Sequence, residues 1–381
     1  MSIDREQRAA AWLQAWDLSG THRTGTAGDA AGAAWLAREA AALGAAVMVE
    51  EFALDRIDPG AAYLDVDGVR FDGVPVFDAP ATGPDGIAGT LGTVGSDATI
   101  GVAELAPLAV YSGAYRAIRS GTAHAGLVIV CQGGQSGLAL LNAERFRDPY
   151  GAPAIHVGSE ARDAILSAGA RGATARLVAH STRSPARADN VVVTLPGRDP
   201  ARPRLVVMTP RSSWWHSTAE RGGGLVCWLE SLRALRTAPP ACDVVFTANS
   251  GHELGHVGLD DFVARRPGWD RPGGAVWVHY GANLGATGGR LSLMSNDDAL
   301  RAFAADALAR AGQKPDVLAP VSQVPSGETR DIHRAGGRYV TLVGSNALFH
   351  LPQDRWPHAV GLAAVARIAA GAAGLVMTLA H

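Results

Sequence analysis

Hydrophobic and polar positions divide the chain into segments of two kinds. Residues 28–43 place apolar side chains at helical spacing and lead into a strand. After residue 185, apolar runs alternate with helical segments; the runs are ADNVVVTLPG, RPRLVVMTP, CDVVFTANS, GAVWVHYGA and RYVTLVG. Strands that are apolar on both faces and alternate with helices predict an α/β fold, with a mostly parallel, mixed sheet sandwiched by helices.

The middle of the chain has a different pattern of predicted secondary structure. Residues 58–185 contain short strand-like segments broken by Gly, Pro and Asp, with one helical stretch, SEARDAILSAG. This pattern predicts a β-rich domain at 58–185, inserted into an α/β domain formed by residues 1–57 plus 186–381.

Composition narrows the class of protein. The 381 residues are 47% hydrophobic and 18% charged, as in an ordinary globular protein, and the formal net charge of -2 argues against nucleic acid as a partner. The three cysteines lie in or beside apolar runs without metal-type spacing, which favours free thiols and a cytoplasmic location. We expect no signal peptide at the N-terminus, and a buried helix rather than a membrane span at the C-terminus.

Residues 252–256 read HELGH, the spelling of the zincin motif. In a zincin, both histidines bind zinc from one face of a continuous helix, with the glutamate as general base. Here the motif follows a strand directly, and glycines surround it, so a continuous helix is disfavoured. The zincin interpretation is therefore the weaker one, and we expect His256 to be a loop residue that touches no metal.

The longer segment FTANSGHELGHVGL resembles the strand-to-loop segment of the co-catalytic zinc aminopeptidases, metallopeptidase family 28. In that family two adjacent glutamates follow the strand, the first as general base and the second as metal ligand. The resemblance puts His252 in the position of the base and Glu253 in that of the ligand. The segment ALFHLPQDR is similar to the one that carries the family's last histidine ligand, here His350, and the middle of the chain resembles the protease-associated domain of many members.

Departures from the family pattern change the expected metal content. The family's first metal loop carries His-x-Asp, where this chain has Pro210 and Ser212, and a further aspartate ligand falls at or near Ala282. The bridging aspartate falls at Glu220. The resemblance therefore implies one divalent ion, held by Glu220, Glu253 and His350, with zinc in the first place and manganese or iron as alternatives.

Four further residues lie in segments expected near this site. His216 and His279 are candidates for an additional ligand or a substrate contact, or for histidines that only support the ligands. Arg211 and Trp215 suit a substrate with a carboxylate or an aromatic ring, although tryptophans there can also pack against the inserted domain.

Two ambiguities stay open. Glu220 precedes Arg221, so its carboxylate could be held in an ion pair instead of on a metal. Glu328 falls near a family segment that lines the pocket, and no role is assigned to it.

The resemblance implies a metal-dependent hydrolase that acts on an amide or related C–N bond of a small or short peptide-like substrate. His252 would serve as catalytic base, or else as a fourth ligand. The alternative is a catalytically inactive homologue without metal, a binding module as in the transferrin receptor. Association into a homo-oligomer is left open.

Overall fold

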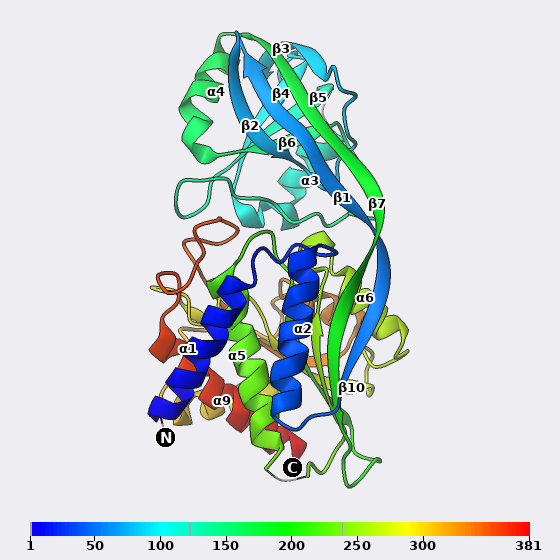
Figure 1. Ribbon diagram of the computed structural model, residues 1–381, viewed down its shortest axis with the longest axis vertical. Coiled ribbons are helices and arrows are strands. Elements are labelled where there is room, and N and C mark those ends of the chain that lie inside the picture. Colours follow the sequence, from blue (N-terminus) through cyan, green and yellow to red (C-terminus); the bar gives the residue numbers. More distant parts are fainter. Residues whose placement is uncertain (1, 122, 238) are drawn as a thin grey trace.

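The computed structural model describes residues 2–121, 123–237 and 239–381. Figure 1 shows two lobes connected by two long strands, β1 (Val47–Val66) and β7 (Thr174–Leu195). These strands pair antiparallel along almost their whole length, with a register shift between Pro59 and Ala62. They run without a break through both expected domain boundaries, at residues 57/58 and 185/186. The chain therefore passes between the lobes on a paired ribbon.

The main lobe is built on the part of the sheet with order β7-β9-β8-β10-β13-β11-β12. Four central strands run parallel, β8 (Arg204–Pro210), β9 (Val244–Asn249), β10 (Ala275–Tyr280) and β13 (Arg338–Gly344). β7 lies antiparallel to β9, and β11 (Leu291–Ser295) lies antiparallel to β13 and parallel to β12 (Val317–Leu318). The sheet is thus mixed with a parallel centre, as the apolar runs predicted.

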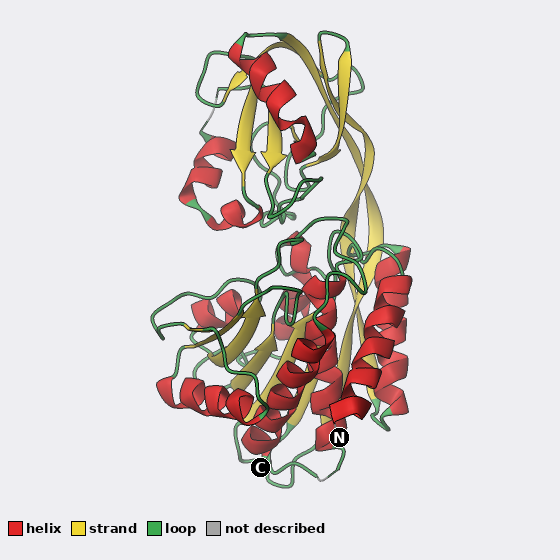
Figure 2. Cartoon of the chain, turned by 90° about the vertical axis from the view of Figure 1, so that its left-hand side faces the viewer, coloured by secondary structure: helices red, strands yellow, loops and turns green. Residues whose placement is uncertain are grey.

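Successive residues of these strands face opposite layers of helices. On one face, Val207, Phe246 and Val278 share a core with five helices, α1 (Ser2–Leu18), α2 (Ala27–Ala42), α5 (Thr218–Leu235), α7 (Asp298–Arg310) and α9 (Leu362–Ala380). On the other face, Val206 and Val245 pack with α6 (Val257–Ala264) and α8 (Thr329–Ala335). Figure 2 shows helices packed over the strands of this lobe. The predicted α/β sandwich is confirmed.

The C-terminal helix α9 is apolar enough to be examined as a membrane span. By length and composition it passes, with a mean hydropathy of 1.8. Half of its most apolar window is buried inside the structure, and its Ile368, Leu375 and Val376 belong to the core that α5 shares. A core helix meets the same criteria, so the helix by itself is weak evidence for a membrane.

The other lobe has a core of its own. It contains β2 (Val69–Pro75), β3 (Ile87–Thr93), β4 (Ile100–Leu105), β5 (Gly126–Cys131) and β6 (Ala154–Val157), together with α3 (Gly113–Ser120) and α4 (Arg162–Ala170). Val102, Val128 and Ile155 form that core with Ile165 of α4 and Leu177 of β7. We call this part the inserted lobe; its resemblance to a protease-associated domain stays a prediction.

Candidate functional site

Loops that follow β8, β9, β10 and β13 meet at one edge of the main sheet, because parallel neighbours place their carboxyl ends on the same side. The loop after β9 carries the HELGH stretch. Its first residues form a short 3-10 turn, His252–Leu254, and α6 begins only at Val257. Gly251 and His256 adopt left-handed backbone conformations, with φ of 88° and 62°. The continuous zincin helix is absent, as predicted.

Gly251 is fixed by the crowding of this turn. A Cβ atom there would lie 2.4 Å from Cγ2 of Val257, in a backbone conformation that L side chains rarely adopt. The tight turn brings His252 and His256 back toward each other, and their ring centroids are 5.3 Å apart. The two histidines therefore meet without lying on one helix.

Glu220 lies in the first turn of α5 and belongs to a buried cluster with Arg221 and His350, which we call the Glu220 cluster. Arg221 Nη2 lies 2.7 Å from Oε1 of Glu220, and Nε2 of His350 lies 3.6 Å from the same oxygen. Burial alone would raise the pKa of Glu220, but the charge of Arg221 lowers it. The ion pair that the sequence left open is present.

The other two members of this cluster are held by backbone carbonyls. Arg221 Nε donates to the carbonyl of Ser212 at 2.7 Å, and His350 Nδ1 donates to the carbonyl of Leu140 at 2.6 Å. Burial lowers the pKa of His350, so its ring is neutral near pH 7. A guanidinium keeps its proton in proteins, so the positive charge beside Glu220 is permanent.

Glu253 makes its hydrogen bonds to residues outside the Glu220 cluster. Its Oε1 accepts a hydrogen bond from the backbone N–H of Thr24 at 2.7 Å, and its Oε2 accepts one from the hydroxyl of Ser212 at 2.6 Å. Burial raises the pKa of the Glu253 carboxyl, against the effect of these hydrogen bonds. Both of its oxygens thus stabilise the loops around the site.

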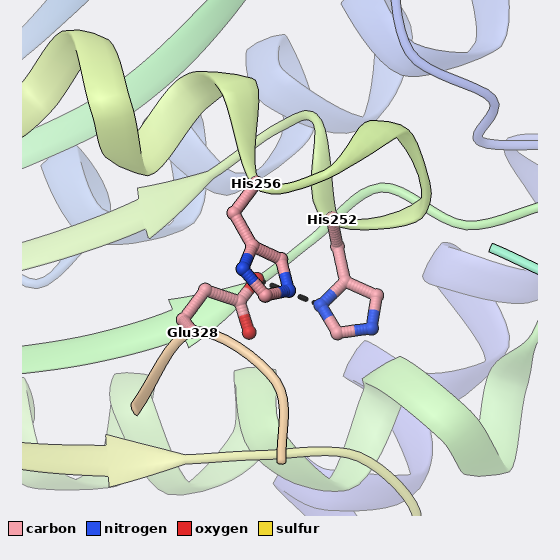
Figure 3. A group of neighbouring side chains, drawn as sticks. All are labelled: His252, His256 and Glu328. Carbon is pink, nitrogen blue, oxygen red and sulfur yellow. Dashed lines mark hydrogen bonds and ion pairs between the residues drawn. The ribbon is translucent and has the colours of Figure 1, made fainter. Parts of the chain in front are cut away.

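Among the described residues, the predicted ligands Glu220, Glu253 and His350 do not form a group of three donor atoms within 4.8 Å of one another. Two of its members lie together, but a permanent cation already neutralises Glu220, and Glu253 is bonded elsewhere. Within the described part of the chain, one group of three ligand residues has its donor atoms within 4.8 Å of one another, and all three side chains are buried. That group consists of His252, His256 and Glu328, and we call it the His252 group (Figure 3).

Glu328 fixes the orientation of the His252 ring. His252 Nδ1 donates to Oε1 of Glu328 at 2.8 Å. Burial, with the nearby charge of Arg221, lowers the pKa of His252 to about 4, so the ring is neutral near pH 7. Burial alone would raise the pKa of Glu328, but the neighbouring histidines hold it well below its usual range. The result is a buried carboxylate that orients a neutral imidazole.

His256 has the opposite protonation behaviour. Its Nδ1 donates to Oδ2 of Asp331 at 2.5 Å. Burial alone would lower its pKa, but this hydrogen bond and the charge of Glu328 raise the pKa to about 9. Its Nε2 is buried without a hydrogen-bond partner. The expectation that His256 is a passive loop residue did not anticipate this position between two carboxylates.

His279, on β10, completes the surroundings of Glu328. Its Nδ1 is hydrogen-bonded to the hydroxyls of Thr341 and Thr329, at 2.7 and 2.6 Å. Its Nε2 lies 3.5 Å from Oε2 of Glu328, and neither atom has a hydrogen-bond partner. Of the two extra histidines predicted near the site, His279 thus lies beside Glu328.

A pocket of about 210 Å³ opens beside the His252 group. Its walls come from both lobes: Leu108 and Tyr111 belong to the inserted lobe, and the rest to the ends of β10 and β13 and to loops of the main lobe. His252, His279 and Glu328 contribute its polar wall, together with Asn283 and Asn346. The pocket is the size of a small ligand, not of a folded protein segment.

The remaining predicted contacts lie away from this pocket. Arg211 is fully buried and pairs with Asp29 at 2.7 Å, so its guanidinium faces the interior. Trp215 donates from Nε1 to the carbonyl of His350 at 2.9 Å. The carbonyl of His216 accepts from Trp16, and none of the three predicted residues lines the pocket. The interpretation of Arg211 as a substrate-binding cation at a cleft mouth is corrected by its burial.

Comparison with solved structures identifies the fold. The zinc aminopeptidase BSAP from Bacillus subtilis is similar over 98% of this chain and 95% of its own, with a TM-score of 0.78 and 16% sequence identity. A peptidase M28 precursor from Shewanella amazonensis SB2B has a TM-score of 0.78 and 14% identity over 100% of this chain and 96% of its own. An aminopeptidase from Aneurinibacillus sp. strain AM-1 has a TM-score of 0.71 and 14% identity over 98% and 93%.

No protein-family model and no curated protein matches the sequence. At 14 to 16% identity, the structural likeness shows a zinc-aminopeptidase-like fold along nearly the whole chain. Activity has to be argued from the site, because one fold can carry many functions.

Proposed function

We propose that this protein is a metal-dependent hydrolase that cleaves an amide or related C–N bond of a small or short peptide-like substrate. The observation that carries the proposal is the pocket walled by His252, His279 and Glu328. It lies at the carboxyl edge of a mostly parallel sheet, where ligands of such folds bind. The likeness to zinc aminopeptidases supports hydrolysis as the reaction class.

His252 is the side chain through which the protein would act on the scissile group. Glu328 holds the ring through Nδ1, and Figure 3 shows the other nitrogen, Nε2, pointing away from the group. That nitrogen can hydrogen-bond a substrate and exchange a proton with it. Such general acid–base catalysis contributes about 10²–10⁴-fold to a rate.

Substrate recognition would combine apolar and amide groups. Leu108, Tyr111 and Phe349 provide apolar walls, while Asn283, whose buried Oδ1 has no hydrogen-bond partner, offers an amide group for a peptide-like backbone. A substrate with one apolar side chain and one amide bond suits this combination. A bound divalent ion, zinc in the first place, would supply a water of lowered pKa and polarise the scissile carbonyl.

The second candidate is a binding module without catalytic activity. A specific observation favours it: Arg221 neutralises Glu220, and Glu253 is bonded to Thr24 and Ser212. A protein that lost its metal at this position could retain the pocket as a binding site. Turnover separates the two candidates.

The test is hydrolysis of a panel of dipeptides, N-acyl amino acids and amino-acid amides by the zinc-supplemented protein. We expect turnover for at least one class, reduced about 100-fold or more by His252→Gln. The matched control is His358→Gln, at an exposed histidine. Saturable binding of the panel without any turnover would instead establish the binding module.

A further inference from the structure

We propose that His252, His256 and Glu328 form a divalent-metal site, at a position different from the ligand set that the family resemblance implies. The catalytic use of this ion rests on the proposed function, whereas its binding can be measured without turnover. The donors are two imidazole nitrogens and a carboxylate oxygen, a set that zinc accepts and that manganese or iron also accept.

The three side chains bring their donor atoms close together. One donor atom from each residue lies within 4.8 Å of the other two, and all three side chains are buried. Figure 3 shows the two rings turned toward each other, with the carboxylate of Glu328 beside them. Donors about 2 Å from a common metal are separated by up to about 4 Å, so small side-chain movements would complete the coordination.

Unpartnered atoms point to a missing ligand at this place. His256 Nε2 and Glu328 Oε2 are buried and have no hydrogen-bond partner. Buried polar atoms are normally paired, and unpaired ones suggest an ion or water that completes them. A cation among these atoms would satisfy both at once.

The surroundings also match those of metal-bound histidines. Such a histidine usually donates its second ring nitrogen to a carboxylate or carbonyl, which fixes the ring. His256 does this through Nδ1 to Asp331 at 2.5 Å. Its Nε2 is thereby left for the ion.

The charge of Arg221 acts on His252 as well, but its direct ion-pair contact is with Glu220, so a cation is opposed most strongly at the Glu220 cluster. The ion-pair partners of Glu328 within 4.0 Å, among described residues, are the two histidines His252 and His279. Imidazoles release a proton when a metal binds. Arg221, which lies 2.7 Å from Glu220, cannot do so near neutral pH.

This arrangement also explains the HELGH spelling. Both histidines would bind the ion, but from a 3-10 turn and a left-handed residue instead of one helix. The carboxylate of Glu253, between them in sequence, accepts hydrogen bonds from Thr24 and Ser212, so it is not placed as the base of a zincin. For the ion to bind Nδ1 of His252, the single proton of the neutral ring would shift to Nε2, where it can donate a hydrogen bond to a substrate.

The test is metal analysis after zinc loading and dialysis, with cobalt(II) absorption as a second readout. We expect about one equivalent in the wild type, and less than about a tenth in His256→Ala and in Glu328→Gln. His350→Ala and Glu253→Gln are the matched controls and should retain the equivalent. Full retention in His256→Ala with loss in His350→Ala would overturn the site.

A milder variant guards against misfolding of the alanine variant. Asp331→Asn keeps the three ligands and alters the hydrogen-bond partner of His256, together with the longer contacts of Asp331 to Arg330 and Arg334. We expect zinc affinity to fall about 10–100-fold, measured by competition with a chromophoric chelator. Unchanged affinity in this variant, together with unchanged metal content in Glu328→Gln, would also overturn the proposal.

Failure of this site and failure of the proposed function give different results. Zinc that is lost in His256→Ala, with no turnover of any panel substrate by the wild type, supports the site and refutes the hydrolase. Turnover that survives chelation, with no zinc retained by the wild type, refutes the site and the metal dependence, and leaves only hydrolysis standing.

Discussion

Two buried polar groups lie at the same edge of the sheet and differ in one respect. The Glu220 cluster combines a carboxylate and an imidazole with the guanidinium of Arg221, whereas the His252 group combines a carboxylate with two imidazoles. Both contain buried atoms without hydrogen-bond partners. The difference is that a guanidinium is a permanent cation and an imidazole proton can be exchanged. Burial and donor type alone therefore do not define a metal site; the nearby fixed charge also matters.

The largest expected effect comes from removing the carboxylate of the Glu220 cluster. Glu220→Gln would leave the buried guanidinium of Arg221 without its anion, which costs about 3–5 kcal/mol of unfolding free energy. Urea denaturation of the zinc-free wild type and variant measures this loss of unfolding free energy. In the double variant Glu220→Gln/Arg221→Met, most of this loss should be recovered, because the buried charge is gone. A loss below about 1 kcal/mol would mean that Arg221 finds another partner.

The His252 group should instead respond to alkaline pH. The pKa of His256 is raised to about 9, so its protonated form stabilises the fold fully below the ordinary histidine pKa near 6.5. This stability is lost as pH rises from about 6.5 through 9, at up to about 1.4 kcal/mol per unit and roughly 3 kcal/mol in total.

Urea denaturation of zinc-free protein at pH 6, 8 and 10 measures this loss. Asp331→Asn should flatten the profile, because it removes the hydrogen-bonded carboxylate that raises the pKa of His256. The same slope in the variant and the wild type would assign the alkaline loss to another residue.

Removing the carboxylate of the His252 group should cost less than the corresponding change at Glu220. In Glu328→Gln the amide oxygen can still accept from Nδ1 of the neutral His252 ring, and the charged His256 keeps its hydrogen bond to Asp331. We expect a loss of about 1–2 kcal/mol in zinc-free protein. If Glu328→Gln lost as much unfolding free energy as Glu220→Gln, the proposed difference between the Glu220 cluster and the His252 group would be wrong.

Much of the architecture could be predicted from local pattern. CDVVFTANS gives β9, whose six residues are all buried, because a strand covered on both faces must be apolar throughout. The glycines around HELGH also predict that no continuous helix forms there, and Gly251 and His256 do adopt left-handed conformations. Both features depend on residues close together in the chain.

The partners within the site could not be predicted in the same way. Glu328 lies 76 residues after His252, and no spacing indicates that the two side chains hydrogen-bond. The segment SGETRDIH does carry a signal, because Glu328 and Asp331 are three residues apart at the start of a helix and face one region. The resemblance drew attention to Glu253 instead, whose hydrogen bonds to Thr24 and Ser212 depend on tertiary structure.

The smallest expected effect comes from changing Trp215, which does not line the pocket but contacts His350 of the Glu220 cluster. Trp215→Phe removes the hydrogen bond from Nε1 to the carbonyl of His350 and retains most of the aromatic surface. The expected loss is about 1 kcal/mol of unfolding free energy, typical of one hydrogen bond. Because His350 is not among the ligands of the His252 group, zinc content should stay at the wild-type value. A substantial loss of zinc in Trp215→Phe would show that the metal depends on the Glu220 cluster after all.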